Sequence, residues 1–239
     1  MFSGYKFENL WVRIGNQKIW EESNVKLLGV NIDKQLKFDS HINDLCSKAS
    51  KKLSAMTRLA KYLSFKKKKI LFNSFFQSQF KYCPLVWMFC GRKANNRINR
   101  LHERALRVIY DNYNLNFSEL LEKDKSFTIH HQNIQILCIE MYKIVNNGSN
   151  EGITELLNRS VDAYRGRSER DFIIPRVQTE QYGKNSFRYL GPKIWDSLPI
   201  EIRRKSFSDF KSYIKRWKPI DCPCTLCKTY IQGVGYINT

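Results

Sequence analysis

Acidic residues are scarce in this sequence. The chain of 239 residues has 22 Asp and Glu against 41 Lys and Arg, which gives a formal net charge of +19. Folding does not need such an excess of one sign. It indicates a polyanionic partner, with nucleic acid as the first candidate and an anionic membrane surface as the second.

Long apolar runs and a secretory signal are also lacking. The longest apolar run, near 82–90, is interrupted by Pro84 and is far too short to cross a bilayer. Residues 1–11 show no cationic start followed by an apolar stretch. The seven cysteines are odd in number and scattered, except near the C-terminal end, as expected of reduced thiols. We therefore expect an intracellular protein, nuclear and/or cytoplasmic, with no membrane partner.

The positive charge is concentrated in one part of the chain. No Asp or Glu occurs in 45–102, whereas fourteen Lys and Arg do. Apolar residues recur at three- and four-residue steps in 39–63 and 95–110, which predicts amphipathic helices with one cationic face each. A second helix is expected to begin at 65–66, and its run over 70–80 is apolar nearly all round, which predicts a buried helix. A polyanion site, if there is one, should therefore lie in this region.

Four arginines step by three and four residues along the last of these helices. Guanidinium groups match phosphate oxygens with two parallel hydrogen bonds, so such a row can hold a nucleic-acid backbone with little reading of base sequence. The alternative is an ordinary solvated face with Glu103 as a local partner. The predicted contacts to nucleic acid are Lys48, Lys51, Lys52, Arg58, Lys61, Lys66, Lys67, Lys68, Arg97, Arg100, Arg104 and Arg107.

The ends of the chain differ from this basic region. Segments 10–14 and 18–20 flank a Gly-Asn turn and predict a β-hairpin, and 25–33 predicts a third strand. The expected fold is mainly α, with a small N-terminal hairpin or three-strand edge. The expected divisions are a β region (1–33), a basic helical domain (34–112), a helical or mixed region (113–218) and a Cys-rich tail (219–239).

The tail holds Cys222, Cys224 and Cys227, a density typical of metal ligands. Structural zinc usually takes four ligands, so a fourth would have to come from elsewhere in the fold. The candidates for it are His41, His102, His130, His131, Cys46, Cys83, Cys90 and Cys138. The alternative is a tail of free thiols that binds no metal.

Three blocks of sequence resemble one family when they are taken together. Residues 26–42 fit the pattern K-x-L-G-V-x-I-D-x-x-L-x-F-x-x-H-I, 78–87 read SQFKYCPLVW, and 99–107 read NRLHERALR. These blocks resemble, in the same order, those of non-LTR (LINE-type, jockey-like) retrotransposon reverse transcriptases. The Gly-Pro-Lys-Ile-Trp segment at 191–195 and the Cys-Pro-Cys tail resemble the C-terminal end of that family.

The resemblance implies the thumb and post-thumb region of an RNA-directed DNA polymerase, a fragment of a polymerase-type fold. It makes Leu28, Gly29 and Val30 a primer-grip-like turn at the end of the palm, and the helices after it a thumb that holds RNA, DNA or an RNA–DNA hybrid. The rest of the polymerase would join it in cis, upstream of Met1.

The catalytic carboxylates of that family are not found in this sequence. No two Asp are adjacent, so the aromatic-x-Asp-Asp motif that holds two divalent metals is missing. We therefore assign no catalytic residue and no resident cofactor beyond the candidate zinc, and expect magnesium only with the missing palm. The chain alone should not polymerise. The alternative function is a protein-interaction or scaffold module with a basic surface.

Overall fold

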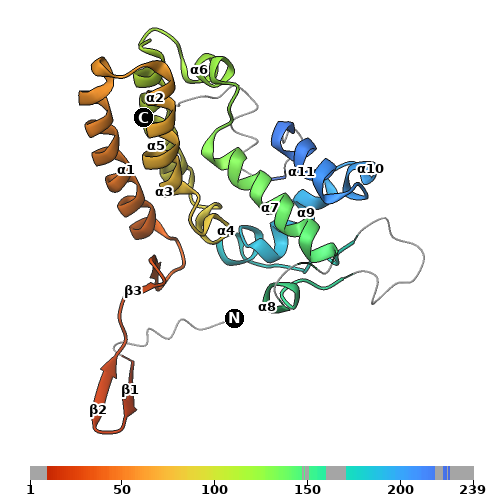
Figure 1. Cartoon of the computed structure of the whole chain (residues 1–239). Coiled ribbons are helices and arrows are strands. Elements are labelled where there is room, and N and C mark those ends of the chain that lie inside the picture. The colour runs from red at the N-terminus through yellow and green to blue at the C-terminus, as the bar shows by residue number, and fades with distance from the viewer. Residues whose placement is uncertain are drawn as a thin grey trace.

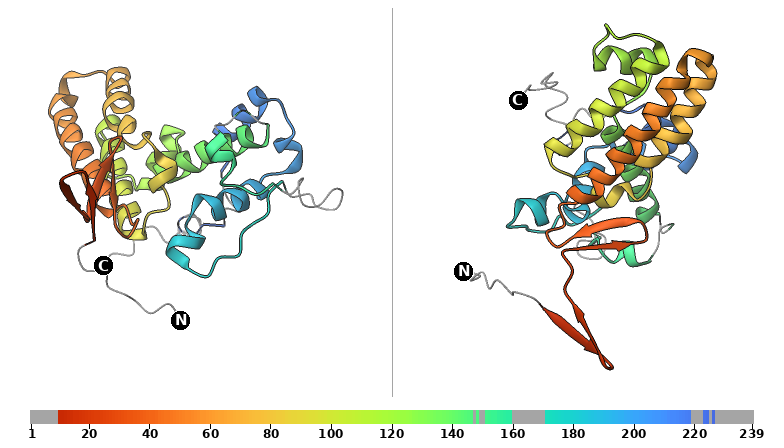
Figure 2. Two further views of the ribbon diagram at one scale, coloured as in Figure 1. Left: turned by 90° about the horizontal axis from the view of Figure 1, so that it is seen from below. Right: turned by 90° about the vertical axis from the view of Figure 1, so that its left-hand side faces the viewer.

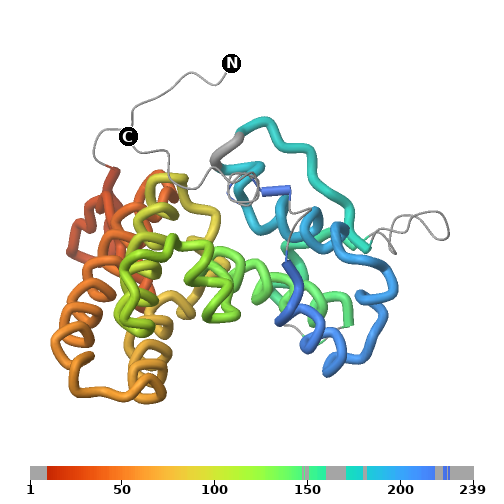
Figure 3. The backbone as a smooth tube through the Cα atoms, turned by 90° about the horizontal axis from the view of Figure 1, so that it is seen from above, coloured from red at the N-terminus to blue at the C-terminus, as the bar shows by residue number. Residues whose placement is uncertain are grey.

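The computed structural model describes residues 10–146, 148, 151–159, 171–218, 223, 224 and 226. The described chain is mainly helical, with two small antiparallel sheets near its N-terminal end (Figure 1). This confirms the mainly α fold that composition and periodicity predict. In Figure 3 the helices form two groups, and helix α7, in green, runs from between them into the second group.

The first sheet is the predicted hairpin. Strands β1 (Trp11–Ile14) and β2 (Gln17–Trp20) pair antiparallel around Gly15, whose φ of +59° suits a tight two-residue turn. All eight strand residues are exposed, and the hairpin projects away from the helices (Figure 2). It therefore adds little to the core.

The prediction of a third strand over 25–33 is wrong, because this run turns back on itself. Strands β3 (Asn24–Leu27) and β4 (Val30–Asp33) pair antiparallel and form a second two-stranded sheet. Leu28 and Gly29 make the turn with φ of 45° and 85°. Two left-handed residues in succession give the turn whose twist matches a tight hairpin. The N-terminal region is two hairpins and not a three-strand edge.

Helices follow the second hairpin. They are α1 (Asp39–Leu59), η1 (Ala60–Tyr62), α2 (Phe65–Leu71), the π-helical η2 (Phe72–Gln77), α3 (Ser78–Phe80), α4 (Pro84–Trp87), α5 (Arg92–Tyr110), α6 (Phe117–Asp124), α7 (Ile129–Val145), α8 (Glu151–Thr154), η4 (Glu180–Lys184), α9 (Phe187–Asp196), α10 (Ile200–Arg203) and α11 (Phe207–Arg216).

The first hydrophobic core lies among α1, η2, α5 and α6. The predicted apolar stripe of α1 is buried, and the aromatic side chains of η2 and α3 pack against it; the stripe comprises Ile42, Leu45, Ala49, Leu53 and Met56. Helix α6 packs on α5, so this core continues through Phe117 to Ile129. It thus extends beyond residue 112, the expected end of the basic domain.

The second core is built on α7, α9 and α11. The ring of Tyr142 stacks on Phe210 with centroids 4.5 Å apart, and Trp195 lies 5.7 Å from Phe210. Gly191 lets α9 approach α7, because a Cβ there would meet Met141 Sδ at 3.1 Å. Helix α7 serves both cores, since its first residue belongs to the first and its remaining buried apolar residues to the second.

None of the helices that the structure describes combines the length and the apolar character needed to cross a membrane.

Candidate nucleic-acid interface

The junction between β4 and α1 is held by Asp33. Its carboxylate accepts hydrogen bonds from the backbone N–H groups of Gln35 and Lys37, at 3.0 Å each, and from that of Phe38. Burial raises the pKa of Asp33, but these backbone hydrogen bonds outweigh it and leave the pKa below its usual value. Asp33 of the 26–42 block therefore holds the backbone before α1 through hydrogen bonds to three N–H groups.

His41 fixes the other side of this junction. Its Nδ1 accepts the backbone N–H of Asn31 at 3.3 Å, and its ring centroid lies 6.3 Å from that of Trp87. Burial and the charge of Lys48 lower its pKa against the opposing effect of Asp44, so the imidazole is neutral at pH 7. A neutral Nδ1 can accept a hydrogen bond, as this contact requires.

Tyr82 in the 78–87 block anchors the Leu28–Gly29 turn. Its hydroxyl donates to the carbonyl oxygen of Leu28 at 2.5 Å, and Trp87 Nε1 donates to the carbonyl oxygen of Tyr82 at 3.1 Å. Of the three residues predicted to form a primer-grip-like turn, Leu28 is 82% exposed, Gly29 lies against the Tyr82 ring and Val30 is buried. The blocks 26–42 and 78–87 are thus in direct contact in the fold, and the side chain of Leu28 is exposed to solvent.

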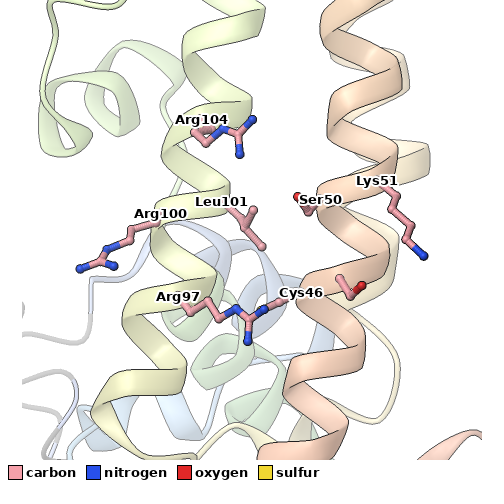
Figure 4. A pocket seen from close by; sticks show the side chains of 8 residues that line it. Cys46, Ser50, Lys51, Arg97, Arg100, Leu101 and Arg104 are labelled. Atoms are coloured by element: carbon pink, nitrogen blue, oxygen red, sulfur yellow. The ribbon is translucent and has the colours of Figure 1, made fainter.

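A groove of about 560 Å³ runs between α1 and α5. Its wall from α1 is small and polar, and its wall from α5 carries arginines (Figure 4). The lining residues are Cys46, Ser47, Ser50, Lys51, Arg97, Arg100, Leu101 and Arg104. Four of the predicted contact residues are brought together here.

The cations of the groove point in different directions. In Figure 4, Arg97 and Arg104 extend from α5 toward α1, whereas Arg100 points away from α1 and Lys51 points away from α5. Arg97 Nη1 donates to Asn43 Oδ1 on α1. All four cations are exposed, and within the described parts of the chain none of them forms an ion pair.

Two other cations of this region are engaged within the fold. Arg107 Nη2 pairs with Glu103 Oε1 at 2.8 Å and lies 3.4 Å from the carbonyl oxygen of Leu115. Lys69 pairs with Asp124, whose Oδ1 also accepts the hydroxyl of Tyr110 at 2.8 Å. Arg107, predicted as a contact, is half-buried and neutralised by its local acid, whereas Lys69 was not among the predicted contacts.

The remaining predicted contacts lie outside the groove. Lys48 and Lys52 are on α1, Arg58 and Lys61 lie at and beyond its C-terminal end, and three lysines are on α2. Most are exposed; Lys52 and Lys68 are partly covered, and Lys66 and Lys67 are open to solvent. These cations extend the positive surface beyond the groove.

Sequence reasoning missed the polar residues of α1 that face α5. Asn43, Ser47 and Ser50 recur at four- and three-residue steps beside the buried stripe, and two of them line the groove. That spacing was visible in the sequence as one small polar row. Nothing local showed which helix it would face.

The 99–107 block also contributes a buried histidine to the core. His102 is fully buried, with its ring stacked on Phe72 at 5.6 Å and edge-on to Phe117 at 5.5 Å. Burial lowers its pKa to about 4, with Asp124 acting in the opposite direction and Lys69 in the same one. His102 is therefore a packing residue that stays neutral.

The candidate metal ligands are only partly covered by the structure. Cys222 and Cys227 lie outside the described residues, whereas Cys224 is buried with its Sγ 3.3 Å from His130 Nε2. The described residues contain no group of three or more His, Cys, Asp or Glu that could hold a metal ion. His41 and His102 are in the first core and Cys224 in the second.

Comparison of the chain with protein-family models, curated proteins and solved structures gave no match.

Proposed function

We propose that this chain binds the phosphate backbone of a nucleic acid along the groove between α1 and α5, as the thumb-like C-terminal part of a retroelement RNA-directed DNA polymerase. The observation that carries the proposal is the set of exposed guanidinium groups of Arg97, Arg100 and Arg104 beside Lys51, none of which pairs with an acid among the described residues. The sequence blocks that resemble the polymerase family support the second half of the proposal.

The chemistry of the groove favours phosphate over other anions. Arginine presents a planar set of donors that binds two phosphate oxygens at once. Arg97 and Arg104, two helical turns apart and both extended toward α1, can each contact a phosphate of one strand. The α1 wall adds the hydroxyls of Ser47 and Ser50, which can donate to the same oxygens. The lining residues of this groove include no Asp or Glu, so no acidic side chain of its wall would repel a phosphate backbone.

The test is a binding titration of the full chain with labelled duplexes of about 20 base pairs (RNA–DNA hybrid, RNA and DNA) at several salt concentrations. We expect affinity to fall steeply with salt and to vary little with base sequence, because each phosphate contact adds about 0.9 to the slope of log K against log salt. Affinity that does not change between 50 and 300 mM salt would contradict the proposal.

Two variants with the same change in net charge distinguish binding in the groove from attraction by the total charge. Replacing Arg97, Arg100 and Arg104 together by Gln should weaken binding to all sequences alike and lower the salt slope by about 2 to 3. The control replaces Lys211, Lys215 and Arg216 on α11 by Gln, which removes the same charge from another exposed surface. The control should change affinity much less; equal losses in the two variants would show that net charge alone attracts the ligand.

A protein-interaction module is the second candidate, because of the β1–β2 hairpin. Trp11 and Trp20 are 47% and 56% exposed, and their ring centroids lie 6.4 Å apart. Large exposed apolar side chains on an open strand pair are typical of surfaces that a partner covers. Light scattering tests self-association: a stable monomer that does not bind nucleic acid would argue against both candidates.

A further inference from the structure

The β1–β2 hairpin gathers two kinds of side chain on one of its faces. Successive residues of a strand point to opposite faces, and residues paired across two strands share a face. The register pairs Trp11 with Trp20 and Arg13 with Lys18, so these four side chains lie on the same face. None of the residues of β1 and β2 is acidic. This face is therefore aromatic and cationic, and Figure 2 shows that the hairpin projects away from the helices.

The contacts on this face agree with the register. Lys18 Nζ lies 4.6 Å from the centroid of the Trp11 ring, and the rings of Trp11 and Trp20 are tilted by 55° with their centroids 6.4 Å apart. Rings in this arrangement do not cover each other as stacked rings would, so ring surface stays open to a ligand. The side chains of Arg13 and Lys18 are exposed as well. Flat apolar rings and mobile cations are thus offered side by side.

The opposite face of the hairpin has a different character. It carries the aliphatic side chains of Val12, Ile14 and Ile19, all of them exposed. Such a face suits a protein partner, as the second candidate function requires. The face with the tryptophans points to a ligand that combines flat rings with negative charge.

We propose that the face formed by Trp11, Arg13, Lys18 and Trp20 binds unpaired nucleotides of a single-stranded nucleic acid. The indole rings stack on bases, and the guanidinium and ammonium groups contact the phosphates beside them. Aromatic side chains next to a positive backbone contact are the usual means of binding single strands without sequence preference. The inference goes beyond the proposed function, because no residue of the hairpin lines the groove between α1 and α5 and either surface can bind without the other.

An anionic membrane is another polyanion that tryptophans and cations can meet. A hairpin that enters a membrane would present apolar residues at its turn, because polar groups there lose their hydration. This turn is Gly15–Asn16, followed by the polar Gln17. The tryptophans are at the open end of the hairpin, and the cations are nearer the turn. This order of residues favours a nucleic acid.

The test titrates the full chain with two labelled strands of about 12 nucleotides. One is oligodeoxythymidine, and the other is an abasic strand with the same number of phosphates. Tryptophan fluorescence reports on the hairpin, because Trp87 and Trp195 are buried and Trp217 is half-buried, whereas Trp11 and Trp20 are exposed. We expect the strand with bases to bind roughly tenfold more tightly and to quench this fluorescence. Equal affinity for the two strands would overturn the proposal.

Two double variants assign the preference for bases to this face. Trp11→Leu with Trp20→Leu keeps apolar side chains but removes the rings, so it should bind both strands alike and bind blunt duplex as the wild type does. Val12→Thr with Ile19→Thr is the control on the opposite face and should keep the preference. Should the leucines loosen the hairpin, Trp11→Phe with Trp20→Phe keeps smaller rings and should retain part of the preference. A leucine variant that keeps all of it would overturn the proposal.

Further measurements separate other ligands and the groove. Quenching by phosphatidylserine vesicles and not by oligodeoxythymidine would assign the face to a membrane, and self-association that only the leucine variant abolishes would assign it to a protein. Either result overturns the proposal. The Gln variant of Arg97, Arg100 and Arg104 should bind duplex weakly and still prefer the strand with bases. Loss of duplex binding thus tests the groove, and loss of the preference for bases tests the hairpin.

Discussion

At the scale of single residues, the most informative group is one that takes no part in binding. His102 lies among three phenylalanine rings in the first core, and neither of its ring nitrogens has a hydrogen-bond partner among the described residues. An imidazole in such a place can pack only in its neutral form. Protonation of His102 at acidic pH should therefore destabilise the first core.

This sensitivity leads to a prediction for stability. Burial holds the pKa of His102 near 4 in the fold, against 6.5 in the unfolded chain. The pKa of His102 is lower in the folded protein than in the unfolded chain. The part of the folding stability that depends on neutral His102 is therefore fully present above pH 6.5 and is lost as the pH falls toward 4. Protonation of His102 should lower the free energy of unfolding by about 2 kcal/mol between pH 7 and pH 5. The His102→Phe variant should lack this part of the pH dependence. Urea unfolding of both proteins at the two pH values measures the difference.

A neighbouring substitution provides the control for this experiment. Phe117→Leu disturbs the same aromatic cluster without changing a titratable group. It should lower stability by a similar amount at both pH values. A His102→Phe protein that keeps the full pH dependence of the wild type would show that other groups, such as His131 with its pKa of about 4, carry the effect.

At the scale of elements, the turn between β3 and β4 shows how far the sequence can be read. The helices of the first core repeat their apolar residues strongly, and this local pattern was enough to predict the buried stripe of α1. Leucine gives no local sign of a left-handed backbone, so the turn at Leu28 could not be predicted. The groove could not be predicted either, because it depends on which faces of α1 and α5 meet.

Pairing of distant charges is a further limit at this scale. Glu103 lies four residues from Arg107, and the sequence pointed to it as a local partner. Asp124 neutralises Lys69 from 55 positions away in the sequence, which no local pattern reveals. The row of basic residues therefore predicted the region of positive charge correctly but could not tell which cations are engaged within the fold.

The Leu28 turn leads to a prediction of its own. Asparagine adopts the left-handed conformation more readily than leucine, and Asn-Gly is the preferred pair for such a turn. Leu28→Asn should therefore raise the free energy of unfolding by about 1 kcal/mol, measured by urea unfolding. The control is Leu27→Asn, since Leu27 is also exposed but lies in strand β3. An unchanged or lower stability of Leu28→Asn would mean that Leu28 makes contacts worth more than the backbone strain.

At the scale of the whole molecule, the charge of +19 acts against folding as well as for binding. The exposed arginines of α5 and lysines of α1 and α2 repel one another wherever no acid lies between them. Salt screens such repulsion with a Debye length of about 10 Å at 0.1 M. Stability and nucleic-acid binding should therefore respond to salt in opposite directions.

The corresponding experiment follows thermal unfolding at 20 and 300 mM NaCl. We expect the wild-type Tm to rise with salt, and the Gln variant of Arg97, Arg100 and Arg104 to be the more stable protein at low salt, by about 2–4 °C for a gain near 1 kcal/mol. The α11 control variant should gain less, because Asp209 lies on the same helix as its lysines. A triple-arginine variant that is less stable than wild type at both salt concentrations would show that these side chains mainly support packing.

Helix α7 gives the molecule a mechanical property. With 17 residues it is a rod of about 25 Å, and it is embedded at one end in the first core and along the rest of its length in the second. Any swing of one group of helices against the other must therefore bend this rod or pull its first turn out of the first core. A ligand bound between α1 and α5 would contact the group of helices that holds the first turn of α7. We therefore expect any displacement that the ligand causes there to reach the second group of helices through this turn.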